Sequence, residues 1–292
     1  MIPIALVTCK NFRDLCQDDQ LLINPLKSYG FDPYAAVWND QSVRWDKYQA
    51  LIVRSSWDYH KSIEKFYAWL DKIENLKIPV WNPIEVIRWN IDKTLYLKDL
   101  AKKGLPVIPT ASFPKRSEVQ LIDVMVKQNW ETVIIKPRFG GSGTGIFKAD
   151  RNDADNQQKK FEELLQNNDI LIQPYMKEIQ EGEYSFIFFN GVFSHAVLKK
   201  PKPGEYRVNY DFGGSWTKLS ASENFIVQAK RIITAVKTSL LYARIDMFNI
   251  NGRLILNELE LSDPMLFLKW HPASDVTFAS VFRDFMDKSC IP

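Results

Sequence analysis

Residues 244–261 read Arg244-Ile245-Asp246-Met247-Phe248-Asn249-Ile250-Asn251-Gly252-Arg253-Leu254-Ile255-Leu256-Asn257-Glu258-Leu259-Glu260-Leu261. The Asn-Gly pair between two apolar runs predicts two antiparallel strands around a tight turn. A plain two-residue turn would place Asp246 opposite Asn257 and leave Glu258 pointing away, because side chains alternate between faces. We favour a three-residue loop centred on Gly252 with a bulge. This register pairs Asp246 with Glu258 and gathers on that face Phe248, Ile250, Leu254 and Leu256.

The favoured register brings three carboxylates together at one end of an apolar face. Asp246, Glu258 and Glu260 would lie within roughly 5 to 8 Å of one another. Like charges that close are unfavourable unless a cation joins them or one is protonated. Carboxylate oxygens suit Mg²⁺, which often takes phosphate oxygens as further ligands. The simpler alternative is an exposed acidic strand end, and phosphate-binding features elsewhere favour the metal site over it.

Those features begin with a glycine-rich hairpin. A strand over 133–137 carries Lys136 and is followed by Gly140-Gly141-Ser142-Gly143-Thr144-Gly145 and a short strand over 146–148. Strand, loop and strand differ from the strand, loop and helix of a P-loop. The glycines can bring backbone N–H groups close to an anion. Lys93, near the start of a helix expected over 89–102, and Arg207 add positive charge, although each could equally be a solvated surface residue.

The first eighty or so residues predict parallel α/β units. Short apolar runs over 4–7, 34–38 and 50–53 alternate with helical patterns over 19–29 and 63–74. Ligands in such sheets collect beyond the carboxyl ends of the strands, so the loop over 54–60 is a candidate binding lip. Arg54 could grip a substrate carboxylate there, while Trp57 and Tyr59 either wall a pocket or pack between domains. Pro79 and Pro83 mark a domain boundary.

The second half predicts mostly antiparallel sheet. A helix over 155–166 precedes strands over 170–173, 183–189 and 192–199, and the last two are joined by the turn pair Asn190-Gly191. A further helix is expected over 223–241. The fold class is therefore α/β with α+β lobes.

Composition excludes several classes of protein. The chain has 38 Lys and Arg against 35 Asp and Glu, a net charge of +3, which gives no general field for nucleic acid. Its three cysteines are odd in number and lack zinc-ligand spacing, which is typical of a cytoplasmic protein. We find no signal peptide and no apolar run long enough to span a membrane. The many aromatic residues leave a homodimer open.

In their order, these motifs resemble the ATP-grasp superfamily in its glutathione-synthetase-like branch. A closer resemblance, to the O-ureido-serine cyclo-ligases of cycloserine biosynthesis and their bacterial relatives, rests on residues 54–59, 88–93, 182–185, 193–197 and 258–261. The resemblance implies three domains, with residues 1–87 as an N-terminal α/β domain, 88–172 as a lobe that carries the phosphate lysines and glycine loop, and 173–292 as a lobe that carries the metal-binding hairpin.

The resemblance also implies a role for each matched residue. The phosphates would be held by Lys93, Lys136 and the loop residues Gly140, Gly141, Ser142 and Gly143. The rest of ATP would contact Gln173, Pro174, Tyr175, Met176, Glu183 and Lys199. Arg207 and Asn209 would face the acyl phosphate, and the metal ligands would be Asp246, Glu258 and Glu260. Substrate would contact Arg54, Ser55, Trp57, Asp58, Tyr59 and Arg207. Ser262-Asp263-Pro264 is more acidic than the pattern leads us to expect.

These implied roles describe an ATP- and Mg²⁺-dependent ligase. It would join an amino-acid-like carboxylate to an amine, or cyclise it, through an acyl phosphate, with ADP and phosphate as products. No protein nucleophile is needed. The alternatives are an ATP-grasp kinase that phosphorylates an alcohol and a nucleotide-binding module without ligase activity.

Overall fold

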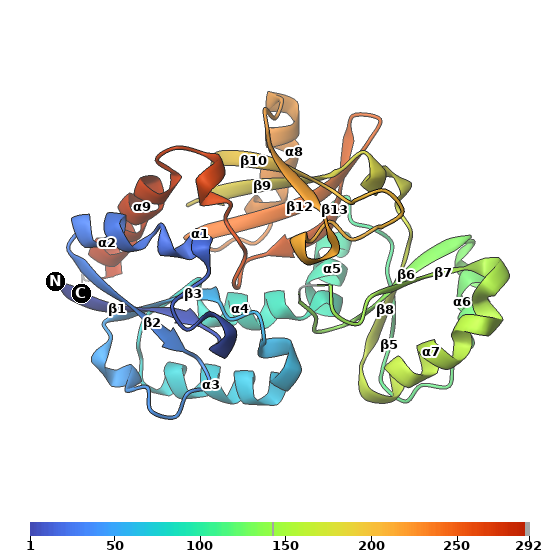
Figure 1. The fold of residues 1–292 in the computed structure, drawn as a ribbon, viewed down its shortest axis with the longest axis horizontal. Coiled ribbons are helices and arrows are strands. Elements are labelled where there is room, and N and C mark those ends of the chain that lie inside the picture. The colour runs from blue at the N-terminus through green and yellow to red at the C-terminus, as the bar shows by residue number, and fades with distance from the viewer. Residues whose placement is uncertain (142, 290–292) are drawn as a thin grey trace.

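The computed structural model describes residues 1–141 and 143–289, in which the strands form three sheets. Figure 1 shows the first sheet at one end of the molecule and the second at the other, with the third between them. This mixed α/β architecture confirms the predicted fold class.

The first sheet is parallel and has the strand order β2-β1-β3-β4. Its strands are β1 (Ile2–Thr8), β2 (Phe31–Val37), β3 (Ala50–Ser55) and β4 (Val80–Trp81). The short helices α1 (Gln17–Gln20) and α2 (Ile23–Ser28) follow β1, and α3 (Ile63–Asn75) follows β3. One face of β1 packs on α3 through Val7 and Phe66. The other face packs on the C-terminal helix α9 (Ser274–Ser289), as Ile4 and Phe282 do.

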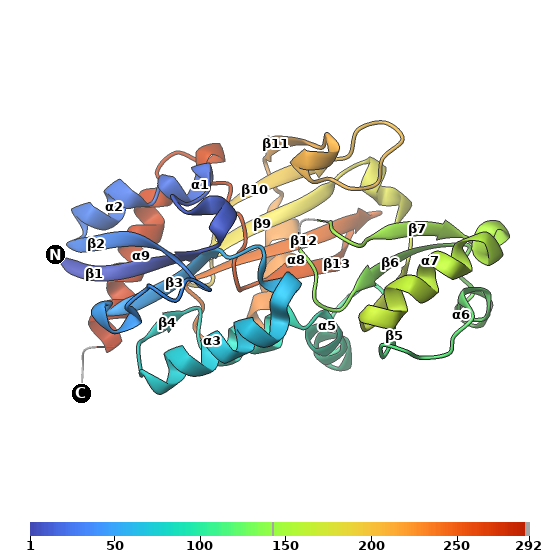
Figure 2. The ribbon, with the colours of Figure 1, turned by 60° about the horizontal axis from the view of Figure 1, so that its bottom comes forward.

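The second sheet is antiparallel and has the order β5-β8-β6-β7. It contains β5 (Ala111–Phe113), β6 (Thr132–Pro137), β7 (Phe147–Asp150) and β8 (Ile170–Pro174). The helices α6 (Leu121–Gln128) and α7 (Ala154–Asn167) cover it, and Phe161 is buried against Val133 and Ile135. Figure 2 shows these elements as a separate lobe. The pairing of β6 with β7 confirms the predicted hairpin around the glycine-rich loop.

The third sheet is antiparallel and has the order β11-β10-β9-β12-β13. It contains β9 (Glu183–Phe189), β10 (Val192–Lys200), β11 (Ser215–Leu219), β12 (Tyr242–Ile250) and β13 (Arg253–Glu260). Asn190 and Gly191 turn between β9 and β10 with φ of 47° and 72°, as the Asn-Gly pair predicts. The helices α5 (Lys93–Lys102) and α8 (Glu223–Thr234) pack on one face of the sheet.

Three predicted helices have different limits in the structure. The helical pattern over 19–29 is two short helices, α1 and α2. The helix expected over 89–102 is two helices, α4 (Ile84–Ile91) and α5, because Asp92 is extended and its carboxylate caps α5 by accepting from Leu95 N at 3.1 Å. The helix expected over 223–241 ends at Thr234. Lys237 has a φ of 58°, which a right-handed helix cannot contain.

The loop predicted for the β12–β13 hairpin is wrong, although the predicted pairing of Asp246 with Glu258 is confirmed. Ile250 pairs with Arg253, so the loop has two residues, with φ of 52° at Asn251 and 87° at Gly252. The register shift lies between Asp246 and Met247, where Asn257 is the additional residue of β13.

The predicted apolar face of this hairpin is also wrong. Met247 pairs with Leu256, whereas Phe248 pairs with Ile255. Leu254 and Leu256 therefore belong to the core on the α8 side, and Phe248 belongs to a separate cluster. A bulge inside the strand, rather than a longer loop, brings Glu258 to Asp246.

The first and third sheets are joined by buried polar contacts. The Asn82 amide donates to the carbonyls of Tyr242 and Leu261, and the hydroxyl of Tyr242 donates to the carbonyl of Val53 at 2.6 Å. The domain limits expected at 87/88 and 172/173 stay a prediction, and the second lies within β8. None of the helices in the described ranges has the length and apolarity needed to cross a bilayer.

Candidate active site

A cavity of about 1020 Å³ is lined by residues from the second and third sheets and by the loops that follow strands of the first sheet. Most of the residues predicted for the site line it. They are Trp57, Asp58, Tyr59, Lys93, Lys136, Gly140, Gly141, Gly143, Gln173, Pro174, Tyr175, Met176, Glu183, Lys199, Arg207, Asn209, Asp246, Glu258 and Glu260. Ser142 lies outside the described residues.

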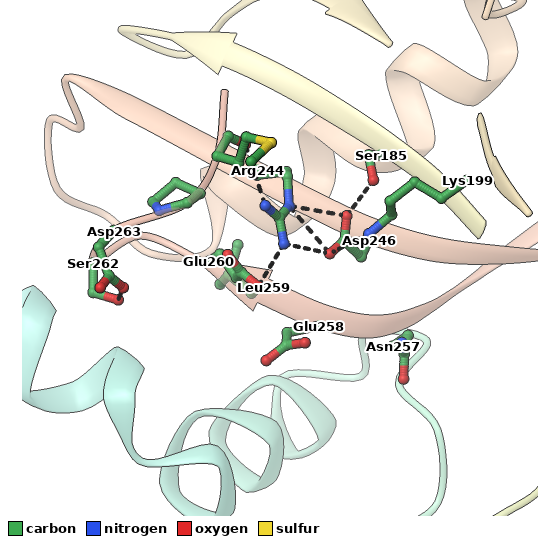
Figure 3. A network of polar contacts seen from close by, with 12 residues as sticks. Ser185, Lys199, Arg244, Asp246, Asn257, Glu258, Leu259, Glu260, Ser262 and Asp263 are labelled. Atoms are coloured by element: carbon green, nitrogen blue, oxygen red, sulfur yellow. Dashed lines mark hydrogen bonds and ion pairs between the residues drawn. The ribbon is translucent and has the colours of Figure 1, made fainter. Parts of the chain in front are cut away.

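Three carboxylates lie together on the cavity side of the β12–β13 hairpin. One oxygen from each of Asp246, Glu258 and Glu260 lies within 4.8 Å of the others. Figure 3 shows these side chains on the same face of the two strands. The bulge at Asn257 produces this arrangement, because it places Glu258 opposite Asp246 within an otherwise regular ladder.

Cationic side chains surround this group. Arg244 forms ion pairs with Asp246 at 3.0 Å and with Glu260 at 2.5 Å. Lys199 contacts Asp246 at 3.1 Å and Glu183 at 2.6 Å. Figure 3 shows Arg244 between the two strands and Lys199 approaching from β10.

The electrostatics of the group favour the ionised form of Asp246 and disfavour the ionised form of Glu260. Burial raises the pKa of Glu260 to about 8, and the neighbouring Glu258 and Asp246 act in the same direction against Arg244. Burial acts against ionisation of Asp246 too, but Arg244 and Lys199 outweigh it and lower its pKa to about 2. A set of close carboxylate oxygens, in which burial disfavours ionisation of Glu260, fits a hard divalent cation such as Mg²⁺.

Two lysines from different elements reach the cavity near these carboxylates. Lys93, at the start of α5, contacts Glu258. Lys136 lies on β6 and is 7% exposed, and its ammonium has no hydrogen-bond or ion-pair partner in the part of the chain that the structure describes. Burial, with a smaller contribution from Lys93, lowers the pKa of Lys136 to about 8. Lys136 is therefore a buried cation that faces open space in the cavity.

The glycine loop lies against the segment that carries Arg207 and Asn209. A Cβ on Gly143, whose φ is 72°, would lie 2.9 Å from the ring of Phe212 and 3.4 Å from Asn209 Oδ1. Only glycine allows this approach without displacement of the neighbours. Arg207 pairs with Glu205 at 2.7 Å and lies 3.5 Å above the Phe212 ring. Residues of the loop and of this segment therefore lie side by side in the cavity wall.

Arg54 and Ser55 do not line the cavity. The Arg54 side chain is fully buried, with an ion pair to Asp19 at 2.9 Å and a donated hydrogen bond to the carbonyl of Pro264 at 2.6 Å. The Ser55 hydroxyl contacts the same Asp19 carboxylate. The structure therefore gives this pair contacts that fix the position of the loop. Of the five residues predicted to contact substrate from this loop, Trp57, Asp58 and Tyr59 line the cavity.

Among the cavity-lining residues that the sequence did not assign to the site are Arg244, Asn257 and Asp263. Arg244 has the spacing of a same-face neighbour of Asp246, so period-two alternation could have found it. Asn257 contacts Glu183 because of the bulge, which has no signature in the sequence. The acidic character of Asp263 is visible in the sequence, but its contacts with Ser56 and Trp57 join residues more than 200 positions apart.

Comparisons with known proteins agree with this geometry. The family model described as "Prokaryotic glutathione synthetase, ATP-grasp domain" matches residues 106–265, and the model "D-cycloserine synthetase DcsG, N-terminal domain" matches residues 4–82. The chain is 25% identical to the cycloserine biosynthesis protein DcsG of Streptomyces lavendulae, over 96% of this chain and 98% of that protein. It is 29% identical to a probable alpha-L-glutamate ligase of Pectobacterium carotovorum, over 98% and 92% of the two chains.

Solved structures show the same relationships. The crystal structure of D-cycloserine synthetase DcsG superposes with a TM-score of 0.88 at 25% identity, covering 97% of this chain and 99% of that one. A D-alanine–D-alanine ligase from Bacillus anthracis shares the fold, with a TM-score of 0.72 at 14% identity over 99% of each chain. The predicted resemblance is confirmed, and the chain is an ATP-dependent ligase that forms a C–N bond. It belongs to the family of the prokaryotic glutathione synthetase ATP-grasp domain.

Proposed function

We propose that this ligase activates a small, amino-acid-like carboxylate as an acyl phosphate and then joins it to an amine. The amine belongs either to a second molecule or to the activated molecule itself, in which case the product is cyclic. One observation carries the proposal: three lysines and three carboxylates line the same cavity. Lys136 is buried and unpaired among the described residues, whereas Lys93 and Lys199 form ion pairs. The carboxylates are those of Asp246, Glu258 and Glu260.

In the first step, a substrate carboxylate oxygen attacks the γ-phosphorus of ATP. The bond between that phosphorus and the oxygen bridging to the β-phosphate breaks, and ADP leaves. Among residues 1–141 and 143–289 no carboxylate pairs with the Lys136 ammonium, so this cation is available to the phosphates. Fixed positive charge in a site with little water stabilises the charge that spreads over the phosphoryl oxygens.

In the second step, the amine nitrogen attacks the acyl carbon. The bond from that carbon to the phosphate oxygen breaks, phosphate leaves, and the nitrogen loses a proton. Arg207 and Asn209 lie beside Gly143 at the cavity wall. From this position the two side chains can bind the acyl phosphate, while the glycine loop keeps water away from it.

Asp246, Glu258 and Glu260 would hold the Mg²⁺. When bound, this cation neutralises part of the negative charge of the phosphate oxygens. Arg244 and Lys199 keep Asp246 ionised, and Lys93 does the same for Glu258, whose pKa is lowered by Lys93 and Lys136 despite burial. The protein therefore presents two ionised ligands at neutral pH.

The test is ADP formation as a function of Mg²⁺ concentration. Glu258→Gln removes one ligand charge with little change of shape, and we expect the rate of ADP release to fall by about 100-fold or more. Asp211→Asn is the matched control, since Asp211 is an exposed carboxylate lining the same cavity, and it should retain the activity. Wild-type turnover by Glu258→Gln at ordinary Mg²⁺ concentrations would show the metal assignment to be wrong.

A further inference from the structure

Asp263 is a buried carboxylate at the lip end of the cavity. It follows the end of β13 by three residues, is 6% exposed, and lines the cavity together with Trp57 and Tyr59. Figure 3 shows Asp263 beyond Glu260, apart from the ion-paired group around Arg244.

Asp263 differs from the acidic residues of the third sheet that line the cavity. Those four residues each pair with a cation: Glu183 with Lys199, Asp246 with Lys199 and Arg244, Glu258 with Lys93, and Glu260 with Arg244. Within residues 1–141 and 143–289, Asp263 has no ion pair. Its oxygens accept only from hydroxyls, Oδ1 from Ser262 and Oδ2 from Ser56, each at 2.8 Å.

The cations whose charge acts on Asp263 are engaged elsewhere. Burial raises the pKa of Asp263, against the hydrogen bonds from Ser56 and Ser262 and the charges of Arg54 and Lys93. Arg54 is bound to Asp19, and Lys93 is bound to Glu258. A buried carboxylate without a paired cation is costly, and a cationic ligand in the cavity would remove that cost.

We propose that Asp263 binds the ammonium group of the substrate, which makes this ligase specific for carboxylates that carry an amino group. This inference rests on the proposed function, because Asp263 would orient the same carboxylate substrate in the same cavity. The carboxylate end would lie toward Lys136 and the phosphates, and the ammonium end toward the lip. The rings of Trp57 and Tyr59 suit this end, since aromatic faces attract cations.

The fixed position of Asp263 supports a role in specificity. Trp57 Nε1 donates to its backbone carbonyl at 2.8 Å, and Ser56 donates to its carboxylate. These hydrogen bonds join the loop over 54–60 to the segment after β13. The Asp263 carboxylate is therefore oriented before substrate binds. A preorganised charged acceptor discriminates between ligands that do and do not supply a donor.

The experiment measures binding of matched compounds by calorimetry in the presence of Mg²⁺ and ADP. Serine, alanine and glutamate, each as both enantiomers, are compared with 3-hydroxypropionate, propionate and glutarate, which lack only the amino group. We expect at least one amino acid to bind wild-type protein roughly 10- to 100-fold more tightly than its partner, the range for a hydrogen bond to a charged group.

The Asp263→Asn variant should lose this preference, whereas Asp211→Asn, which removes an exposed carboxylate of the same cavity, should keep it. Unchanged ADP affinity in Asp263→Asn confirms that the variant is folded. The inference is overturned if Asp263→Asn keeps the preference, or if no amino acid binds wild-type protein more tightly than its partner.

Failure of this inference and failure of the proposed function give different results. Enzyme-dependent activation of propionate or glutarate as readily as of the amino acids would keep the ligase and overturn the role of Asp263. A binding preference that depends on Asp263, in a protein that activates none of these carboxylates, would keep the role of Asp263 and overturn the acyl-phosphate chemistry.

Discussion

Lys136 combines a function in the cavity with a cost in stability. It is 7% exposed, its ammonium has no partner among the described residues, and burial lowers its pKa to about 8. We expect Lys136→Met to abolish ADP formation and to stabilise the ligand-free protein at pH 7 by roughly 1 to 3 kcal/mol, because each pKa unit corresponds to about 1.4 kcal/mol. Urea denaturation and an ADP assay measure the two effects.

The pH dependence of stability follows from the same shift. The unfolded chain binds a proton at Lys136 up to its ordinary pKa of 10.5, whereas the folded chain releases it near pH 8. Stability of the wild-type protein should therefore gain a contribution from this residue as pH rises from about 8 to 10.5, and Lys136→Met should lack it. A Lys136→Met variant that is less stable than wild type at pH 7 would contradict this account.

Single residues were predictable where their chemistry depends on type and spacing. The sequence predicts Asp246, Glu258, Lys93 and Lys136 in this way, and the structure brings all four to one cavity. Arg54 was not, because a sequence does not show that Asp19 lies 2.9 Å from its guanidinium. For the same reason Asp263 could be noticed only as an unexpected charge.

At the scale of elements, the β12–β13 hairpin was predicted with its carboxylates paired but with the bulge in the wrong place. An Asn-Gly pair is favourable in a two-residue turn, and the structure has that turn. The bulge at Asn257 then supplies the extra residue that a three-residue loop was expected to supply. The type of a turn can be predicted from the residues within it, whereas the position of a bulge depends on the neighbouring strands.

The loop between β10 and β11 gives a prediction at the same scale. A Cβ on Gly214 would lie 2.2 Å from the carbonyl oxygen of Val208, a backbone contact that cannot be relieved by a side-chain rotation. Gly214→Ala should therefore displace the neighbouring Arg207 and Asn209 and lower kcat by about 10- to 100-fold, with ATP affinity little changed.

Gly204→Ala is the matched control for that variant. Gly204 lies in the same loop with a φ of 83°, and a Cβ there would have no neighbour within 4 Å. Its cost is backbone strain of about 1 to 2 kcal/mol, so we expect lower stability and nearly normal kcat. Equal kcat values for the two variants would show that the position of Arg207 does not limit the reaction.

Over the whole molecule, the first sheet is held to the third by a buried polar joint in which Arg54 is central. Besides its pair with Asp19, its guanidinium lies 4.7 Å from the centre of the Tyr242 ring. Arg54→Met would leave Asp19 buried without its partner, and we expect a loss of about 3 to 5 kcal/mol in the free energy of unfolding, measured with urea.

The exposed pair of Arg44 and Asp46 provides the comparison for Arg54. The two side chains are 67% and 51% exposed, so Arg44→Met should cost no more than about 1 kcal/mol. A similarly small loss for Arg54→Met, together with a large increase in the KM of the carboxylate substrate alone, would instead support a role of Arg54 in substrate binding.

The overall architecture was only partly readable from the sequence. Alternating strands and helices predicted the parallel first sheet, and paired strands predicted the antiparallel sheets. The packing of α9 on the first sheet, in a hydrophobic cluster that contains both Ile4 and Phe282, joins distant parts of the chain. Contacts of that sequence separation leave no periodic signal, and the sequence therefore gave no reason to expect this helix there.

The central claim is that the cavity forms an acyl phosphate, and hydroxylamine trapping tests it most directly. Wild-type protein, Mg²⁺ and ATP are incubated with hydroxylamine and a panel of amino acids and short carboxylic acids, and hydroxamate and ADP are measured together, with Lys136→Ala as control. The account predicts hydroxamate and ADP in equal amounts from at least one carboxylate, and neither from Lys136→Ala. ADP without hydroxamate, or hydroxamate that persists in Lys136→Ala, would contradict it.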